Sequence, residues 1–335
     1  MRSTKFIHTL WYGEHPVSFL LIPLAWIYQI AIIIRHLAYT SGIIPVKRLG
    51  IPVIVVGNIT AGGSGKTPLV IWLANYLKNK GYHPGIVSRG YGGKASHWPQ
   101  QVRPDSDPLM VGDEPVIISR RTACPVAVGG PNRVSAAEGL IRTNQCDIII
   151  SDDGLQHLAL FRDLEIAVVD SELRFGNKRC LPAGPLREPV RRLETVDIVV
   201  SNGKAGHGEF SMKYIPGRLF KVNDPGNTMS LDDYRNRTVH AVAGIGHPPR
   251  FFRLLRNNGI KTVEHAFPDH YIYNKDDLRF DDDLPVLMTE KDAVKCRYIA
   301  DDKCWFLSID ATMDDIFQHR LANLLKEITD GSKTA

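Results

Sequence analysis

From residue 51 onward the chain alternates short, continuous hydrophobic runs with longer segments whose apolar residues recur every three or four positions. The first pattern predicts buried β-strands, and the second predicts helices that pack on them. We expect strands at 52–56, 84–88, 124–128, 146–151, 164–169 and 196–201, and helices near 66–80, 113–122, 132–144 and 186–195. This alternation is typical of a doubly wound α/β domain with a parallel sheet.

Glycine and proline interrupt the pattern between residues 203 and 235, where only short β-like pieces such as "GRLFKV" are visible. Such a break in composition predicts a linker. The alternation then resumes in "TVHAVAG", "KTVEHAF", "PVLMT" and "CWFLSI", and the chain closes with an amphipathic helix near 314–328. We therefore expect a core domain over 41–202, a linker with short β pieces over 203–235 and a smaller α/β domain over 236–335.

The N-terminal region, residues 1–40, is different because residues 15–34 contain no Lys, Arg, Asp or Glu. Roughly 20 apolar residues are enough to cross a bilayer, although Pro23 and Gln29 make this segment less apolar than a typical span. We expect a membrane anchor that either spans the bilayer or lies in its interface; a buried core helix and a cleaved signal peptide are the alternatives. Basic residues follow the segment, as at a cytoplasmic, lipid-facing border: Arg35, Lys47 and Arg48.

Composition and charge narrow the partners. The hydrophobic fraction of 44% is that of a folded protein, and the formal net charge of +5 suits an anionic partner such as a membrane surface or a phosphorylated substrate. The basic residues are dispersed rather than gathered with aromatics, which argues against nucleic-acid binding, and no feature indicates a protein partner. The five cysteines are scattered without a C-x-x-C pair, so we expect reduced thiols in a cytosolic protein.

The stretch "VVGNITAGGSGKTPLV", residues 55–70, joins a hydrophobic strand to a helix through a glycine-rich turn. In a Walker A loop, backbone N–H groups face the phosphates, a lysine stabilises charge on the outer phosphates and the next hydroxyl ligates Mg²⁺. Lys66 and Thr67 fit these roles, while Thr60 stands where the first glycine is expected. An incidental glycine-rich turn is the alternative. We expect ATP to bind through Thr60, Ala61, Gly62, Gly63, Ser64, Gly65, Lys66 and Thr67.

The run "CDIIISDDGLQH" places two acidic residues, Asp152 and Asp153, at the end of a hydrophobic strand. Open α/β sheets bind ligands at the carboxyl ends of their strands, and Mg²⁺ prefers carboxylate oxygens there. Adjacent side chains of a strand point to opposite faces, so one carboxylate is expected to ligate Mg²⁺ while the other positions a donor. A surface Asp-Asp-Gly turn is the alternative reading.

Eight motifs follow one another behind the apolar segment: "GNITAGGSGKTP", "SRGYGG", "GDEP", "GGPNR", "SDDGLQH", "LPAGPLREP", "FPDHYIY" and "TEKDAVK". This series resembles the tetraacyldisaccharide 4'-kinase family over nearly the whole chain. The resemblance implies a P-loop kinase that transfers the γ-phosphate of ATP to the 4'-hydroxyl of a tetraacyldisaccharide 1-phosphate and forms lipid IV-A in lipid A biosynthesis. It also implies a place on the cytoplasmic side of the bacterial inner membrane.

Two other functions stay open at this point. Loops of the form G-G-x-G-K-T also occur in dimerising, membrane-associated ATPase switches, which carry a second lysine near the start of the loop. Ala61 stands there and disfavours that interpretation. A kinase that acts on another membrane glycolipid would share all of the chemistry.

A sugar hydroxyl is a poor nucleophile, and a carboxylate or histidine that takes its proton promotes the attack. Asp113 in "VGDEP" and His270 in "FPDHY" are the candidates. The resemblance implies that Asp113 orients or polarises His270 as the base, with His247 in "GIGHPP" as the alternative histidine. Glu114 is expected in the metal shell, or else as a first-turn acid that favours its helix.

Weaker candidates surround these residues. Arg89, Tyr91 and Arg133 are suited to gripping the substrate phosphate or the transferring one, because arginine binds phosphate through two parallel hydrogen bonds. Gln156 and His157 are expected to position Mg²⁺ or substrate. Each of these residues has a plain alternative role at the surface or at a helix start. Arg187 and Arg191 are expected on a helix face toward lipid head groups or water, and Lys291 is a weak candidate for a nucleotide contact.

Overall fold

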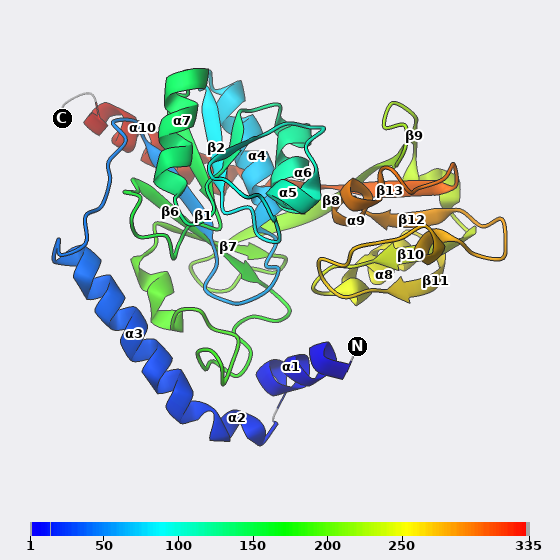
Figure 1. Ribbon diagram of the computed structural model, residues 1–335, viewed down its shortest axis with the longest axis horizontal. Helices are drawn as coiled ribbons and strands as arrows, with labels where there is room; N and C mark the ends of the chain where they lie inside the picture. The colour runs from blue at the N-terminus through cyan, green and yellow to red at the C-terminus, as the bar shows by residue number, and fades with distance from the viewer. Residues whose placement is uncertain (1, 14, 333–335) are drawn as a thin grey trace.

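One β-sheet runs through both halves of the chain (Figure 1). The computed structural model describes residues 2–13 and 15–332, and within them the sheet has 13 strands. Their bounds are β1 Val53–Gly57, β2 Pro84–Ser88, β3 Gln100–Val102, β4 Val126–Val128, β5 Ile148–Asp152, β6 Leu164–Asp170, β7 Ile198–Asn202, β8 Phe210–Lys221, β9 Thr228–Met229, β10 Thr238–Ala243, β11 Lys261–Ala266, β12 Val286–Thr289 and β13 Cys304–Met313.

The strand order is β11-β10-β12-β13-β8-β7-β6-β1-β5-β2-β4-β3, and β9 pairs with β8. Most neighbours are parallel; the antiparallel pairs are β3 with β4, β8 with β13 and β8 with β9. Because β8 pairs with β7 on one side and β13 on the other, it joins an N-terminal lobe, built on β1 to β7, to a C-terminal lobe, built on β10 to β13. The expectation of an α/β chain with a mostly parallel sheet is confirmed.

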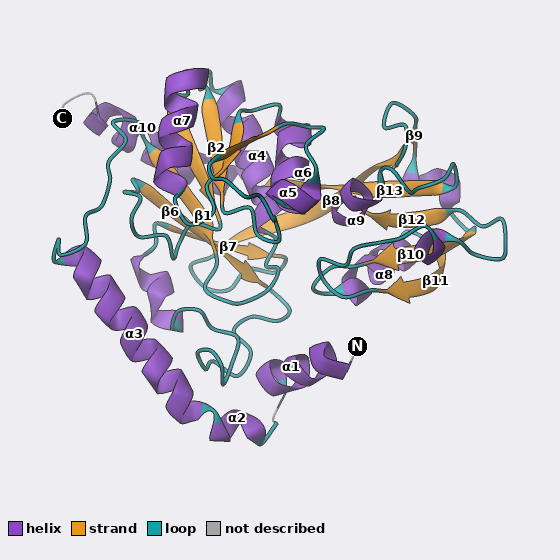
Figure 2. Cartoon of the chain, in the orientation of Figure 1, coloured by secondary structure: helices purple, strands orange, loops and turns teal. Residues whose placement is uncertain are grey.

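Helices lie on both faces of the sheet (Figure 2). The α-helices are α1 Arg2–Tyr12, α2 Val17–Leu20, α3 Ile22–Thr40, α4 Lys66–Asn79, α5 Pro108–Val111, α6 Asp113–Thr122, α7 Arg133–Asn144, α8 Pro248–Asn257, α9 Glu290–Cys296 and α10 Asp315–Ser332. Three short 3₁₀ helices complete the described elements: η1 Val190–Thr195, η2 Leu231–Tyr234 and η3 Asp276–Leu278.

The alternation of side chains along β1 explains why both faces are covered. Ile54 and Val56 pack in a core cluster with apolar residues of α4, α6 and α10, whereas Val53 and Val55 pack with residues of α7. Successive side chains of a strand point to opposite faces, so a strand that is hydrophobic at every position needs helices on both sides. The C-terminal lobe repeats this arrangement with α8 on one face and α9 on the other.

Three expected elements differ in the structure. The helix expected over 186–195 is only the 3₁₀ turn η1, which follows Pro189. The short β pieces expected between 203 and 235 are mainly one 12-residue strand, β8, whose two neighbours extend it despite Pro216 and Gly217. The final helix α10 packs with Phe317 and Leu321 into the core of the N-terminal lobe, although it follows the last strand of the C-terminal lobe.

The apolar N-terminal segment forms α2 and α3, which lie apart from the sheet beyond the loops that follow β6 (Figures 1 and 2). Helix α3 is long and apolar enough to cross a membrane, with 19 residues and a mean hydropathy of 1.3. One narrow face contacts the protein: Tyr28 Oη donates to the carbonyl of Arg187 (3.1 Å) and Arg35 Nη2 donates to the carbonyl of Gln156 (3.0 Å). The other face exposes large apolar side chains: Leu24, Trp26, Ile27, Ile30, Ile33, Ile34 and Leu37.

Candidate active site

The loop between β1 and α4 has the backbone of a phosphate-binding turn. Gly62 and Gly65 have φ angles of +102° and +89°, which glycine adopts without strain. A Cβ at Gly65 would also collide with the Tyr214 hydroxyl. Thr60, at the position of the missing first glycine, is buried and accepts a hydrogen bond from Asn58 Nδ2 (3.3 Å). The loop therefore keeps its turn through Gly62.

Most of the remaining loop residues line one end of a pocket. Gly63, Ser64, Gly65, Lys66 and Thr67 all border it. Ala61 does not, and its N–H donates to the carbonyl of Pro185 (2.7 Å). Of the eight residues expected to hold ATP, the pocket thus brings together the five that open α4, where the helix N-terminus attracts anions.

Lys66 lies between two oxygen acceptors. Its Nζ is 3.2 Å from Asn58 Oδ1 and 3.2 Å from Asp153 Oδ1, and its side chain is 10% exposed. Burying an ammonium group is costly unless such partners are present, so the two oxygens stabilise the Lys66 side chain at the start of α4. Asn58 was missed by the sequence reasoning, although its place directly before the loop, in "GNIT", is the signal that could have found it.

The two acidic residues after β5 have different surroundings. Asp152 is buried; Ser88 Oγ donates to its Oδ2 (2.9 Å), while its Oδ1 is buried without a hydrogen-bond partner among the described residues. Burial, together with the negative charges of Glu114 and Asp153, raises the pKa of Asp152 to about 7. A buried carboxylate oxygen without a partner is costly, and a bound cation would satisfy it.

Asp153 sits in the left-handed region, with φ of +49°, and is ion-paired on two sides. Lys66 Nζ lies 3.2 Å from its Oδ1, and Arg187 Nη1 lies 3.0 Å from its Oδ2. Burial alone would disfavour ionisation, but Lys66, Arg187 and Arg133 lower the pKa of Asp153 below its usual range. Among the described residues, Asp153 thus pairs with two cations, whereas Asp152 pairs with none.

Asp113 and His270 come from different lobes and contact each other. Asp113 opens α6, His270 lies in the loop after β11, and His270 Nδ1 is 3.1 Å from Asp113 Oδ2. This contact raises the pKa of the His270 imidazole above its ordinary value, although burial and Lys291 oppose the rise. His270 has a φ angle of +57°, an uncommon conformation that points to a constrained position.

Lys291 completes this cluster from the start of α9. Its Nζ lies 3.2 Å from Glu114 Oε1, 3.2 Å from Asp269 Oδ1 and 3.5 Å from His270 Nε2. Burial disfavours the ammonium, yet the surrounding carboxylates raise the pKa of Lys291. Glu114, expected in the metal shell, therefore has a lysine as its partner. From the sequence, Lys291 is only a weak candidate for a nucleotide contact, whereas in the structure its Nζ contacts groups from both lobes.

A pocket beside these groups has a volume of about 290 Å³. The phosphate loop forms one end, and Glu114, Asp269 and Lys291 form a polar wall. The other end is apolar and comes largely from the C-terminal lobe: Ile245, Phe251, Leu254, Leu307 and Ile309. An anion-binding end opposite an apolar end matches a nucleotide, with phosphates at the loop and a base at the far wall. His247 lies on this wall, away from Asp113.

The weaker candidates fall into two groups. Arg133 is buried, and its Nη1 donates to the carbonyl of Asp153 (2.8 Å), so it holds the acidic turn. Gln156 Nε2 donates to the carbonyl of Asn58 (3.0 Å). The pKa of His157 is lowered to about 4 by burial and by nearby arginines. Arg89 and Tyr91 are exposed, and the Tyr91 ring centroid lies 5.1 Å from that of His270.

Arg187 was wrongly placed by the sequence analysis. It was expected on a helix face toward lipid or water, but it lies before η1 and pairs with Asp153. Arg191, expected on the same face, is exposed. The signal that could have separated them is the proline on either side of the arginine in "GPLREP", which prevents a regular helix from starting there.

A family profile described as Tetraacyldisaccharide-1-P 4'-kinase matches residues 17–326. The chain belongs to the tetraacyldisaccharide 4'-kinase family. It is 51% identical to the tetraacyldisaccharide 4'-kinase of Nitrosococcus oceani, over 95% of this chain and 93% of that one. It is 45% identical to the enzyme of the same name from Hahella chejuensis, over 98% of each chain. The family stated from the eight motifs, and with it a kinase of lipid A biosynthesis, is confirmed.

A solved member of the family shares the fold of this kinase. The structure is titled the "apo" form of LpxK from Aquifex aeolicus in complex with ATP. It is 28% identical, covers 93% of this chain and 99% of its own, and superposes with a TM-score of 0.78. ATP is therefore the ligand named for the Aquifex aeolicus protein.

Proposed function

We propose that this kinase transfers the γ-phosphate of ATP to the 4'-hydroxyl of tetraacyldisaccharide 1-phosphate and thereby forms lipid IV-A. In the reaction a bond forms between the 4'-oxygen and the γ-phosphorus, and the bond between that phosphorus and the β–γ bridging oxygen breaks. ADP leaves, and the hydroxyl proton passes to a base on the protein. The contact between Asp113 and His270 beside the phosphate loop is the observation that carries this proposal.

Proton removal is assigned to His270 with Asp113. The imidazole offers Nε2 as the basic atom when Nδ1 faces the carboxylate, and Asp113 stabilises the imidazolium that forms. Lys291, 3.5 Å from Nε2, disfavours that second charge and so helps to release the proton after transfer. Lys66 stabilises the charge that develops on the transferring phosphate.

Magnesium suits the oxygen ligands at the end of β5. The buried Oδ1 of Asp152 without a partner, Asp153 and the hydroxyl of Thr67 are the groups that we expect to hold it. The described residues contain no cluster of three or more His, Cys, Asp or Glu side chains that would form a closed metal site. That is the usual situation for Mg²⁺, which binds through one or two carboxylates and the phosphates, and whose charge supports the leaving group.

The substrate is expected on the side of the site that faces α3. Arg35 donates to the carbonyl of Gln156, and Tyr28 donates to the carbonyl of Arg187, so the apolar helix lies against the loops that carry the acidic pair. We infer that α3 holds the enzyme at the cytoplasmic face of the inner membrane, with acyl chains on its apolar side. Arg89, Tyr91, Gln156 and His157 are the candidates for contacts with the sugar and phosphate groups.

We treat residues 41–202 and 236–335 as two domains, apart from α10, that close on the nucleotide. Asp113 belongs to one and His270 to the other, so the geometry of the base depends on the relative position of the two domains. Closure would also exclude water from the reacting phosphate. A change in small-angle X-ray scattering on addition of ATP and lipid tests this, and identical curves with and without both ligands would contradict it.

Transfer itself is tested in detergent micelles with Mg²⁺, γ-labelled ATP and tetraacyldisaccharide 1-phosphate. We expect label in the lipid with the native chain and little label with Lys66→Ala or Asp113→Ala. Label transfer that both variants retain would refute the roles assigned to Lys66 and Asp113, and turnover of ATP with no label in lipid would refute the transfer itself. The second outcome would favour a membrane-associated ATPase switch instead.

A further inference from the structure

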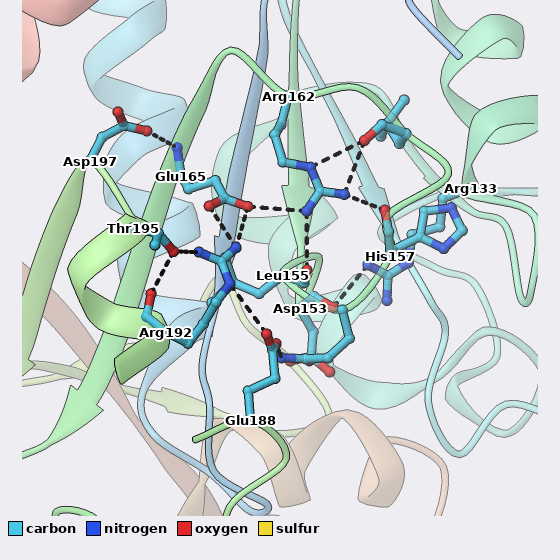
Figure 3. A network of polar contacts seen from close by, with 12 residues as sticks. Arg133, Asp153, Leu155, His157, Arg162, Glu165, Glu188, Arg192, Thr195 and Asp197 are labelled. Carbon is cyan, nitrogen blue, oxygen red and sulfur yellow. Dashed lines mark hydrogen bonds and ion pairs between the residues drawn. The ribbon is translucent and has the colours of Figure 1, made fainter. Parts of the chain in front are cut away.

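A half-buried arginine outside the pocket holds the turn that follows the acidic pair. Arg162 Nη1 donates to the carbonyl of Leu155 (3.0 Å), Nη2 donates to the carbonyls of His157 (2.5 Å) and Leu160 (3.0 Å), and Nε also donates to Leu160 (3.2 Å). Figure 3 shows the guanidinium pointing into the turn, where the backbone oxygens surround it. Four of its five hydrogen bonds therefore go to the backbone of a single loop.

The fifth bond goes to Glu165, 3.1 Å from Arg162 Nη1, and could suggest a plain structural ion pair. Glu165 does not depend on it, however, because Arg192 Nη2 donates to both of its carboxylate oxygens at 2.7 and 2.6 Å. The side chain of Arg162 is only 15% exposed, and burying an arginine is costly unless its donors are satisfied. The loop carbonyls account for most of that satisfaction.

The same network of hydrogen bonds and ion pairs extends to the phosphate loop. Arg192 pairs with Glu188 (3.2 Å), and Glu188 accepts a hydrogen bond from Gln156 Nε2 (2.5 Å), which also donates to Asn58 O (3.0 Å). Asn58 in turn accepts a hydrogen bond from Lys66 Nζ (3.2 Å). The turn after Asp153 is thus held at its inner end by Arg133 and along its length by Arg162 (Figure 3).

We propose that Arg162 is a positioning residue of the kinase: by fixing the turn of residues 154–160 it sets Asp153 and the Asn58 carboxamide against Lys66. Asp153 has the left-handed backbone that needs such support, since it is not glycine. The idea deepens the proposed function and rests on it for its catalytic part. Arg162 itself does not line the pocket.

The first test is hydrogen exchange in the metal-free and nucleotide-free protein, because it needs no activity. In Arg162→Ala we expect the amides of residues 155–160 to exchange at least about tenfold faster, since charge-assisted hydrogen bonds are lost, while α4 exchanges at the native rate. Arg162→Lys keeps the charge and most of the volume and remains useful if Arg162→Ala does not fold; it should give a smaller increase in the same segment. Unchanged exchange in both variants would overturn the proposal.

The second test is catalytic, with Arg174→Ala as the matched control. Arg174 is also a partly buried arginine, with two bonds to Glu209, but makes none to this turn. We expect Arg162→Ala to lower kcat roughly tenfold or more with the KM for ATP within about twofold, and methylguanidinium to restore part of kcat. Equal loss in both variants, or no rescue, would contradict positioning. If the native chain transfers no label to lipid, the proposed function fails while the exchange result still decides the role of Arg162.

Discussion

The phosphate end and the proton-accepting end of the site are built in different ways. The phosphate end comes from one continuous stretch, Gly63 to Thr67, together with the acidic residues at the end of a neighbouring strand, all within the N-terminal lobe. The proton-accepting end joins Asp113 of that lobe to His270 and Lys291 of the other. One end is therefore fixed by the local fold, whereas the other exists only while the lobes keep their relative position.

The largest expected effect concerns the end that spans the lobes. Asp113→Asn and His270→Gln should each lower kcat by roughly 10³-fold, within the range seen for lost acid–base catalysis. Because the two act as one unit, the double variant should be at most a few-fold worse than either single variant. Steady-state phosphate transfer to lipid measures all three. Multiplying losses would show that the two residues act separately.

The phosphate end should respond somewhat less in rate but more in binding. Lys66→Met should lower kcat by roughly 10²- to 10³-fold, as for the loss of one group that stabilises transition-state charge. It should also weaken ATP binding, whereas Asp113→Asn should leave the dissociation constant of ATP within about twofold. Calorimetric titration with a non-hydrolysable ATP analogue separates the two. Equal loss of ATP affinity in both variants would show that the two ends do not differ in their contribution to ATP binding.

The same contrast explains what the sequence could predict. The loop with Lys66 and Thr67, the strand before it and the acidic pair lie in short motifs whose neighbours along the chain are also neighbours in space. The partners of Asp153 do not: Arg187 follows a bend between prolines, and only the folded loop turns it toward the carboxylate. Periodicity placed β1 and β2 well because both strands are short and fully buried. It divided β8 into short β pieces, because the partly exposed residues of this strand resemble a linker.

Lys291 shows a further limit. Its carboxylate partners Glu114 and Asp269 come from different lobes, so no spacing in the sequence reveals that it bridges them. The pairing of Asp113 with His270 rested on the family resemblance rather than on any local pattern. Contacts between the lobes depend on how β8 joins them into one sheet. Such contacts are not predicted when the two domains are treated separately.

The proton-accepting end should depend on pH, because the His270 imidazole must be neutral to act as a base. Asp113 raises the pKa of His270 above 6.5, its ordinary value, and Asp269 adds to the rise while burial and Lys291 oppose it. Since a base must be neutral to accept a proton, kcat/KM should rise with pH through a midpoint above 6.5. Removing the carboxylate in Asp113→Asn lowers the pKa of the imidazole, so the midpoint should move to lower pH even though the maximum rate falls. A midpoint that stays in place would assign the titration to another group.

The smallest expected effect concerns His247, which lies on the same pocket and is also partly buried, but on the apolar wall rather than beside Asp113. Its ring centroid lies 6.4 Å from that of His8 of α1, and among the described residues it makes no ion pair with a carboxylate that would prepare it as a base. His247→Gln should therefore change kcat by less than about threefold, the usual range for a substitution that removes no paired group. The matched His270→Gln variant removes the same ring from the other wall, so the ratio of the two losses in one transfer assay reports which wall carries the proton. A loss in His247→Gln comparable to that in His270→Gln would mean that the base lies on the apolar wall and that the contact with Asp113 is structural.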